Sequence, residues 1–281
     1  MRYGLPYMGS KNKIADWVLS VLPPAKRFYD VFCGGCAVTH AAMLSGRYQE
    51  FYINDIQADV PQLFLDAIRG NLPTDYLAPI SREEFFIRAP HEVLVRLVWS
   101  FGNKGDTYIC GREIERVKLA AHAMITANTI EERYAHYRDF VASLESIEQI
   151  HSIERIHSIE RLNEIQRLTQ NVGGGESVHV SSVDYADVDI LPDSVVYADP
   201  PYRGTHGYGD GEFDFARFDD WLRSTSFPVY VSEYTMPDDF ICIGETQKRE
   251  TLQIHNSEKT EKIFLHERFA STIPRQMEFD F

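Results

Sequence analysis

The feature that most restricts the fold is an apolar run, residues 195–198, that leads directly into Asp199-Pro200-Pro201-Tyr202. The apolar run predicts a buried strand. Proline has no N–H for a sheet ladder, so the strand must end at the two prolines. Because the residue before a proline is held extended, a carboxylate, free carbonyls and an aromatic ring project rigidly from the strand end. Open α/β sheets bind ligands at that end.

This motif suits a planar base that carries an exocyclic amine. The Asp199 carboxylate and the Pro200 carbonyl offer two acceptors for the amine hydrogens, and the Tyr202 ring offers a surface for stacking. The alternative is a proline-rich turn that closes a strand, in which Asp199 is only a turn former. The motif by itself leaves both interpretations open.

The early part of the chain predicts a nucleotide-binding α/β unit. Residues 27–32 are typical of a strand, residues 33–36 (Cys-Gly-Gly-Cys) of a tight turn, and residues 37–44 of a helix. Small residues in such a turn let a ligand approach the backbone. The third glycine of the dinucleotide fingerprint is absent, so the turn is a weak signal when taken alone.

A second strand, predicted for residues 51–55, ends in an acid. Asp55 follows Asp30 by 25 positions, close to the spacing of roughly 20 that is typical of an acid binding a ribose hydroxyl. The ribose interpretation is favoured by the glycine turn upstream. The alternative is that Asp55 only caps the helix that follows.

Near the N-terminus, the turn Met8-Gly9-Ser10-Lys11 precedes an apolar pattern that predicts a helix as far as Leu22. Ser10 is the expected N-cap, and Pro23-Pro24 end the helix. A turn of this kind at a helix start suits a carboxylate or a phosphate. An ordinary capped surface helix is the alternative.

Residues 81–171 predict a helix-rich insertion between the early and the late strands. Its loop at residues 100–108 is polar and contains glycine. Side chains of the loop that suit phosphate or base-edge contacts are Ser100, Asn103, Lys104 and Tyr108. Any exposed turn would have the same composition.

The same insertion contains a repeat at residues 146–168, in which Ile or Leu recurs at every third position. A period of three matches neither the helix nor the strand. The repeat therefore predicts either a helix buried on several sides or a compact run of short turns. His151 and His157 lie six positions apart without further ligands nearby, so no metal site is predicted.

The last third of the chain returns to strand patterns. Residues 178–180 and 229–234 predict strands, and residues 251–254 are expected to pair with residues 262–265 in a terminal hairpin. With the earlier elements, this predicts an α/β fold with a Rossmann-like, mostly parallel sheet and an antiparallel hairpin at one edge.

Composition is that of a globular protein, with 44% hydrophobic residues in 281. The net charge of −14 argues against a general polyanion binder, although a local basic strip can still contact phosphates. Four scattered cysteines, no secretory pattern and no apolar run of membrane-spanning length predict a cytoplasmic protein.

Taken in order, these elements resemble the Dam-like family of DNA adenine-N6 methyltransferases, in the arrangement that has the target-recognition region between the cofactor and catalytic motifs. The resemblance covers nearly the whole chain, and Asp199-Pro200-Pro201-Tyr202 is its most specific part. It implies a catalytic domain at 1–80 and 172–281 and an inserted helical recognition region at 81–171. Implied partners are S-adenosylmethionine, with S-adenosylhomocysteine as product, and double-stranded DNA whose target adenine is flipped out. No metal is expected.

The resemblance also assigns roles to residues. Residues 7–11 match the N-terminal cofactor motif, residues 30–35 match the loop over the methionine part of the cofactor, and Asp55 would take the ribose hydroxyls. Asp184 and Tyr185 would border the cofactor adenine. The implied cofactor residues are Tyr7, Gly9, Ser10, Lys11, Asp30, Phe32, Gly34, Gly35, Asp55, Asp184, Tyr185 and Asp199. Cys36 departs from the family, whose members often have glycine there.

Two rival functions are weighed against this one. Methylation of another amine, in cytosine N4, RNA adenine or a protein glutamine, is disfavoured because related cytosine enzymes tend to have Ser, and glutamine enzymes Asn, at the place of Asp199. A non-catalytic DNA-binding relative is disfavoured because Asp199 occurs together with all the cofactor elements. The recognised DNA sequence and any restriction partner stay open.

The C-terminal residues 276–281 resemble the short peptides with which bacterial and phage proteins bind the replication sliding clamp. A frayed amphipathic tail is the alternative. The expected setting is therefore the cytoplasm of a bacterium or of a phage-infected cell.

Overall fold

The computed structural model describes residues 3–103, 105–144, 155–171, 177–204, 213–248 and 259–272. The chain divides into two compact units. The sheet unit comprises Met1–Tyr3, Lys11–Pro61 and Gly174–Phe281, and the helical unit comprises Gly4–Ser10 and Gln62–Gly173.

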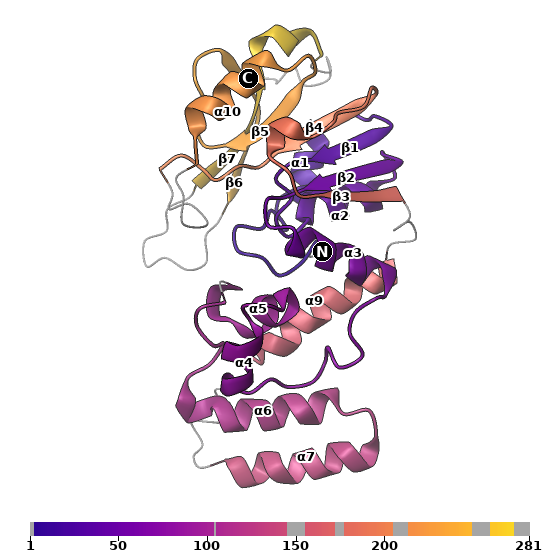
Figure 1. The fold of residues 1–281 in the computed structure, drawn as a ribbon, viewed down its shortest axis with the longest axis vertical. Helices are drawn as coiled ribbons and strands as arrows, with labels where there is room; N and C mark the ends of the chain where they lie inside the picture. The colour runs from indigo at the N-terminus through magenta and orange to yellow at the C-terminus, as the bar shows by residue number, and fades with distance from the viewer. Residues whose placement is uncertain are drawn as a thin grey trace. The chain divides into compact units, whose positions relative to one another are not determined.

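The sheet unit is built on a mixed sheet of seven strands in the order β3-β2-β1-β4-β5-β7-β6 (Figure 1). The first five strands in this order are parallel, and β7 runs antiparallel to both β5 and β6. The predicted α/β class with an antiparallel edge hairpin is confirmed. The strands are β1 (Arg27–Asp30), β2 (Glu50–Asn54), β3 (Val178–Ser181), β4 (Ser194–Ala198), β5 (Val229–Glu233), β6 (Phe240–Lys248) and β7 (Lys259–His266).

Helices cover both faces of the sheet. Alternate residues of a strand point to opposite faces, so neighbouring residues of one strand contact different helices. Tyr29 of β1 belongs to the apolar cluster that contains Phe218 and Leu222 of α10 (Phe215–Ser224). The next residue, Asp30, faces the other way and bonds Thr39 of α2 (Ala37–Ser45). The central strands are buried by these two layers, and their apolar runs follow from that burial.

Helix α1 (Ala15–Val21) packs beside α2 and approaches β6 closely. A Cβ at Gly244 would lie 2.9 Å from the Val21 side chain, which leaves no space for any larger residue there. The strand carries an irregularity between Cys242 and Gly244. Glycine therefore permits the close contact between β6 and α1.

One prediction about an element boundary is wrong. Ser10 is not an N-cap, because a turn with a hydrogen bond from Ile14 N–H to Lys11 O precedes α1, which starts at Ala15. The strand at 262–265 is confirmed within β7, but its partners are β5 and β6. Its predicted partner, residues 251–254, lies outside the described residues.

Short helices make up the helical unit. Its elements are α4 (Arg82–Arg88), α5 (Val93–Trp99), η1 (Phe101–Asn103), α6 (Arg112–Thr126), α7 (Ile130–Ser143) and α9 (His157–Asn171), and α3 (Asp59–Arg69) crosses the boundary between the units. Capping boxes begin α4, with Ser81 and Glu84, and α7, with Thr129 and Glu132. Helices α6 and α7 pack as an antiparallel pair (Figure 1).

The described end of the Ile and Leu repeat, from His157 onward, is helical, and its earlier residues 145–154 lie outside the described part of the chain. Leu162, Ile165 and Leu168 of α9 are all buried. These three positions lie on one face of α9, whereas His157, Asn163 and Arg167 are exposed. The described part of the repeat is therefore a helix buried on one face, and the predicted burial on several sides is not found there. No helix in the described part of the chain is both long and apolar enough to cross a membrane.

Candidate functional site

Three carboxylates gather at the carboxyl ends of adjacent parallel strands. Asp30 ends β1, Asp55 follows β2 and Asp199 follows β4. Asp30 is only 2% exposed, and burial, together with the charges of Asp199 and Asp55, raises its pKa to about 7. The Thr39 hydroxyl donates to Asp30 Oδ2 at 2.7 Å. Asp30 Oδ1 has no hydrogen-bond partner among the described residues.

The glycine turn is tied to the second of these acids. The Gly34 N–H donates to Asp55 Oδ2 at 2.8 Å, and the Gln57 N–H donates to Asp55 Oδ1 at 2.9 Å. Cys36 ends the turn with a φ of 58°, a left-handed conformation that favours glycine. This chain has cysteine at that position.

The Asp-Pro-Pro-Tyr segment projects from β4 into a charged cluster. Lys11 Nζ lies 2.9 Å from Asp199 Oδ1 and 4.5 Å from the centroid of the Tyr202 ring. The Tyr202 hydroxyl donates to Glu261 Oε2, on β7, at 2.6 Å. Lys11 and Glu261 are 6% and 1% exposed, so the cluster is enclosed by protein. We name these four residues, Lys11, Asp199, Tyr202 and Glu261, the amine cluster.

A further buried acid orders the backbone that follows Tyr202. Glu233, the last residue of β5, accepts hydrogen bonds from the Arg203 N–H at 2.9 Å and from the Tyr234 N–H at 2.7 Å. Burial raises the pKa of Glu233. The Arg203 guanidinium bonds Asp219 of α10. Arg203, the residue after the motif, is therefore held through its backbone by β5 and through its side chain by α10.

Asp184 and Tyr185 lie together at the start of the short helix η3 (Tyr185–Asp187). Arg217 of α10 donates two hydrogen bonds of 2.8 Å to Asp184, which lowers the pKa of that carboxyl, and its guanidinium lies over the Tyr185 ring. Tyr185 also packs against Phe32, with ring centroids 5.2 Å apart. Phe32 and Tyr185, predicted separately, thus form one aromatic surface.

The sheet unit therefore brings together most of the predicted site residues. Those that belong to it are Lys11, Asp30, Phe32, Gly34, Gly35, Asp55, Asp184, Tyr185, Asp199, Pro200, Pro201 and Tyr202. Tyr7, Gly9 and Ser10 belong to the helical unit. There the Ser10 N–H donates to the Tyr7 carbonyl, closing a turn in which Gly9 has a φ of 78°.

Ser100 and Tyr108, predicted as DNA contacts, are both buried, and their hydroxyls bond backbone carbonyls of the helical unit. The Ser100 hydroxyl donates to the Arg96 carbonyl, and the Tyr108 hydroxyl donates to the Ile80 carbonyl, both at 2.6 Å. Asn103 donates to the Leu97 carbonyl. Ser100 and Asn103 thus bond carbonyls of α5, and Tyr108 bonds a carbonyl just before α4, so all three side chains help to hold the helical unit together. Lys104 lies outside the described residues.

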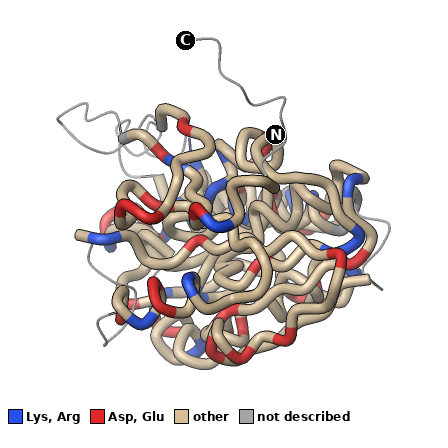
Figure 2. Tube along the Cα trace, turned by 90° about the horizontal axis from the view of Figure 1, so that it is seen from above, with Lys and Arg blue, Asp and Glu red and all other residues tan. Residues whose placement is uncertain are grey.

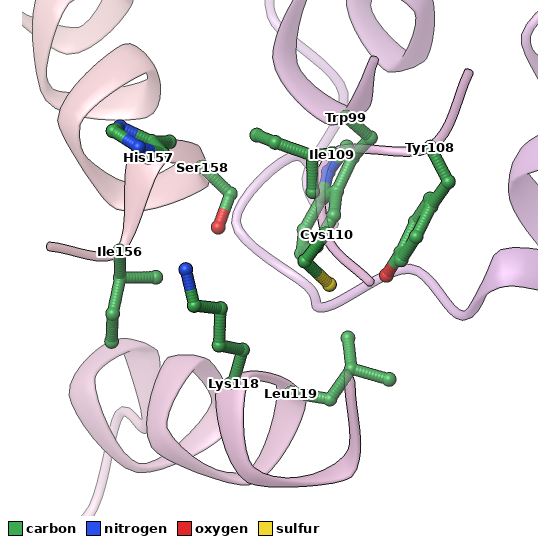
Figure 3. A pocket seen from close by; sticks show the side chains of 9 residues that line it. All are labelled: Trp99, Tyr108, Ile109, Cys110, Lys118, Leu119, Ile156, His157 and Ser158. Atoms are coloured by element: carbon green, nitrogen blue, oxygen red, sulfur yellow. The ribbon is translucent and has the colours of Figure 1, made fainter. Parts of the chain in front are cut away.

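A small cavity lies beside Tyr108 in the helical unit (Figure 3). It is lined by Trp99, Tyr108, Ile109, Cys110, Lys118, Leu119, Ile156, His157 and Ser158. Its volume of about 10 Å³ is on the scale of one water molecule. The cavity is too small for a base or a cofactor.

Charges of both signs are interspersed along the trace (Figure 2). Among the described residues, no group of three or more His, Cys, Asp or Glu side chains is arranged to hold a metal ion.

Sequence reasoning missed Glu233 and Glu261. Glu233 is the second-last residue of the strand predicted at 229–234, so the rule that drew attention to Asp55 could have found it. Glu261 has no comparable local signal, because it lies inside β7 and reaches Tyr202 only through the order of the strands.

The mostly parallel sheet, the acids at or just after the ends of β1, β2 and β4, and the Pro-Pro loop after β4 form the arrangement that the sequence resemblance implies for a methyltransferase acting on an amine. The profile of the D12 class N6 adenine-specific DNA methyltransferases matches residues 7–234. The chain belongs to this family, whose members are S-adenosylmethionine-dependent enzymes that methylate adenine in DNA. A search of curated proteins found no match to the chain.

Proposed function

We propose that the protein transfers the methyl group of S-adenosylmethionine to N6 of an adenine that is flipped out of a specific sequence in duplex DNA. The observation that carries the proposal is the meeting of Asp30, Asp55 and Asp199 at one edge of the sheet, with Asp199 held in the Pro-Pro-Tyr loop.

The acids fit the proposed cofactor. S-adenosylmethionine carries positive charge on its sulfonium and on its amino group, which carboxylates attract. Asp30 Oδ1, buried and without a hydrogen-bond partner among the described residues, would accept from the amino group. Asp55 would hold the ribose hydroxyls, and Tyr185 with Phe32 would border the adenine. When bound, the cofactor supplies an electrophilic methyl group and leaves as S-adenosylhomocysteine.

The motif after β4 would prepare the amine. In adenine the nitrogen lone pair is delocalised into the ring, which makes the amine a poor nucleophile. Acceptance of its two hydrogens by Asp199 and the Pro200 carbonyl would favour a tetrahedral nitrogen whose lone pair is directed at the methyl group. Fixing both reactants in this geometry would supply much of the rate enhancement.

Target recognition is assigned to residues 81–171. With Ser100 and Tyr108 committed to packing, exposed arginines of the helical hairpin are better candidates for phosphate contacts. Arg112 and Arg116 lie four positions apart on α6, so they share one side of that helix. The proposed docking of residues 276–281 on a sliding clamp falls outside the described residues.

The proposal is tested by expressing the protein in a host that lacks adenine methylation and sequencing the modified bases. N6-methyladenine confined to one short sequence is expected, and none is expected with Asp199→Ala. Calorimetry on purified protein should show S-adenosylmethionine binding. Methylated cytosine in place of adenine, or modified DNA with Asp199→Ala, would contradict the proposal.

A further inference from the structure

The side chain of Lys11 takes the contacts that the target base would need. Its ammonium forms an ion pair with the Asp199 carboxylate, with Nζ 2.9 Å from Oδ1, and the adenine amine would need the same carboxylate. It also lies 4.5 Å from the centroid of the Tyr202 ring, which is only 8% exposed. A base that bonds Asp199 and stacks on Tyr202 would therefore have to displace the Lys11 side chain.

A second carboxylate lies within reach of the same ammonium. Glu261 Oε2 is 4.0 Å from Lys11 Nζ and already accepts the Tyr202 hydroxyl at 2.6 Å. Glu261 is 1% exposed and comes from β7, beyond the residues that match the family profile. A small movement of Lys11 Nζ would thus exchange one carboxylate for another without leaving the charge unpaired.

We propose that the Lys11 ammonium occupies the place of the target amine and holds Asp199 and Tyr202 in position until the base arrives. Glu261 then receives the ammonium. Both are positioning residues of the base site, and the inference rests on the proposed function. Buried charges are costly to leave unpaired, so transfer between two carboxylates is the route with the least disturbance.

The test uses three variants of the full chain. Lys11→Met removes the ammonium and keeps a long apolar stem, and Glu261→Gln removes the receiving charge while its amide oxygen can still accept the Tyr202 hydroxyl. The third variant combines the two changes. Lys11→Gln, which keeps a neutral donor for Asp199, replaces Lys11→Met if circular dichroism shows that the latter does not fold.

Two measurements are made on each variant. The first is the single-turnover rate of methyl transfer to the duplex identified by modification sequencing. The second is the fluorescence of 2-aminopurine at the target position with S-adenosylhomocysteine bound, which reports extrusion of the base.

We expect Glu261→Gln to lower the transfer rate and the extruded fraction by about tenfold, within the range of coupling between contacting residues. In the Lys11→Met background the same change should have less than about a twofold effect, because no ammonium needs a receiver. Lys11→Met alone should leave extrusion equal or increased.

Matched controls are Lys13→Met and Glu245→Gln, which remove the same charges at exposed positions outside the amine cluster. They should leave both measurements unchanged. The inference is overturned if Glu261→Gln is equally harmful with and without Lys11, or if Lys11→Met lowers extrusion. A wild-type protein that methylates no adenine would instead defeat the proposed function, so the two failures are distinguishable.

Discussion

The Tyr202 hydroxyl donates a hydrogen bond of 2.6 Å to Glu261 Oε2, across 59 positions of the sequence. The bond ties the loop after β4 to β7, which lies on the far side of β5 in the sheet. The antiparallel hairpin at the sheet edge thereby takes part in the geometry of the base site.

Two substitutions of Tyr202 should distinguish the contribution of its ring to methyl transfer from that of its hydroxyl. Tyr202→Ala should lower methyl transfer by the value of a base stack, about 1–3 kcal/mol. Tyr202→Phe keeps the ring and removes only the bond to Glu261, so its loss should be smaller than that of Tyr202→Ala. Tritiated-methyl incorporation into duplex DNA measures both. Equal losses in the two variants would show that the hydroxyl, and not stacking, carries the role.

Asp30 should make stability depend on pH. Its pKa rises from 3.8 to about 7 on folding, so the native state binds more protons between these values and stability falls as the pH rises through that window. Asp30→Asn cannot ionise and keeps an acceptor for Thr39. The free energy of unfolding of Asp30→Asn, relative to that of the wild type, should therefore increase from pH 4 to pH 8. The increase should reach up to about 4 kcal/mol for a pKa shift of roughly three units.

Urea unfolding at a series of pH values measures this difference. Asp189→Asn, at an exposed acid, is the control and should follow the wild-type curve. Parallel curves for Asp30→Asn and wild type would contradict the prediction.

At position 36, the glycine variant should be more stable than the alanine variant, which is the reverse of the usual order of stability. Its left-handed φ of 58° costs a non-glycine residue about 1–2 kcal/mol. Cys36→Gly should therefore be more stable than Cys36→Ala by about 1 kcal/mol, as measured by chemical unfolding. Cys33 is the matched control, because its φ is not positive, and there the alanine variant should be the more stable. The same order at both positions would argue against backbone strain at Cys36.

Arg161 of α9 should stabilise the helical unit by capping α5. Its guanidinium donates to the carbonyls of Leu97, Val98 and Ser100, at the end of that helix. Arg161→Met keeps an apolar stem but leaves these carbonyls without the donor. The expected cost is about 1.5–3 kcal/mol, the range for hydrogen bonds to charged groups.

Unfolding of the helical unit can be followed by the fluorescence of Trp99. Arg155→Met is a suitable control, because Arg155 makes an exposed ion pair with Glu160 and should contribute less than about 1 kcal/mol. A cost for Arg161→Met no greater than for Arg155→Met would contradict the capping role.

Local patterns predicted the central elements well. The first two strands, the helix at residues 37–44 and the strand before Asp199 are found within two residues of their predicted bounds. Apolar runs bounded by glycine or proline suffice for this, because burial on both faces and the loss of backbone donors act over a few residues. The order of the strands was not predicted and is seen only in the structure.

Errors arose where a distant partner competes with a local preference. Ser10 is a good N-cap by residue type, yet the next residue, Lys11, is held by Asp199, and α1 starts only at Ala15. The polar loop at residues 100–108 suggested exposure, but Ser100 and Tyr108 are buried because they satisfy carbonyls of the helical unit.

By itself, then, the sequence determined the class of fold, the strand-end acids and the Asp-Pro-Pro-Tyr motif, since each depends on residues that are close along the chain. The tertiary structure alone decided that Lys11 contacts Asp199 and that Glu261 holds Tyr202. These contacts join segments separated by a long insertion or by other strands, and no local periodicity records which charges a folded sheet brings together.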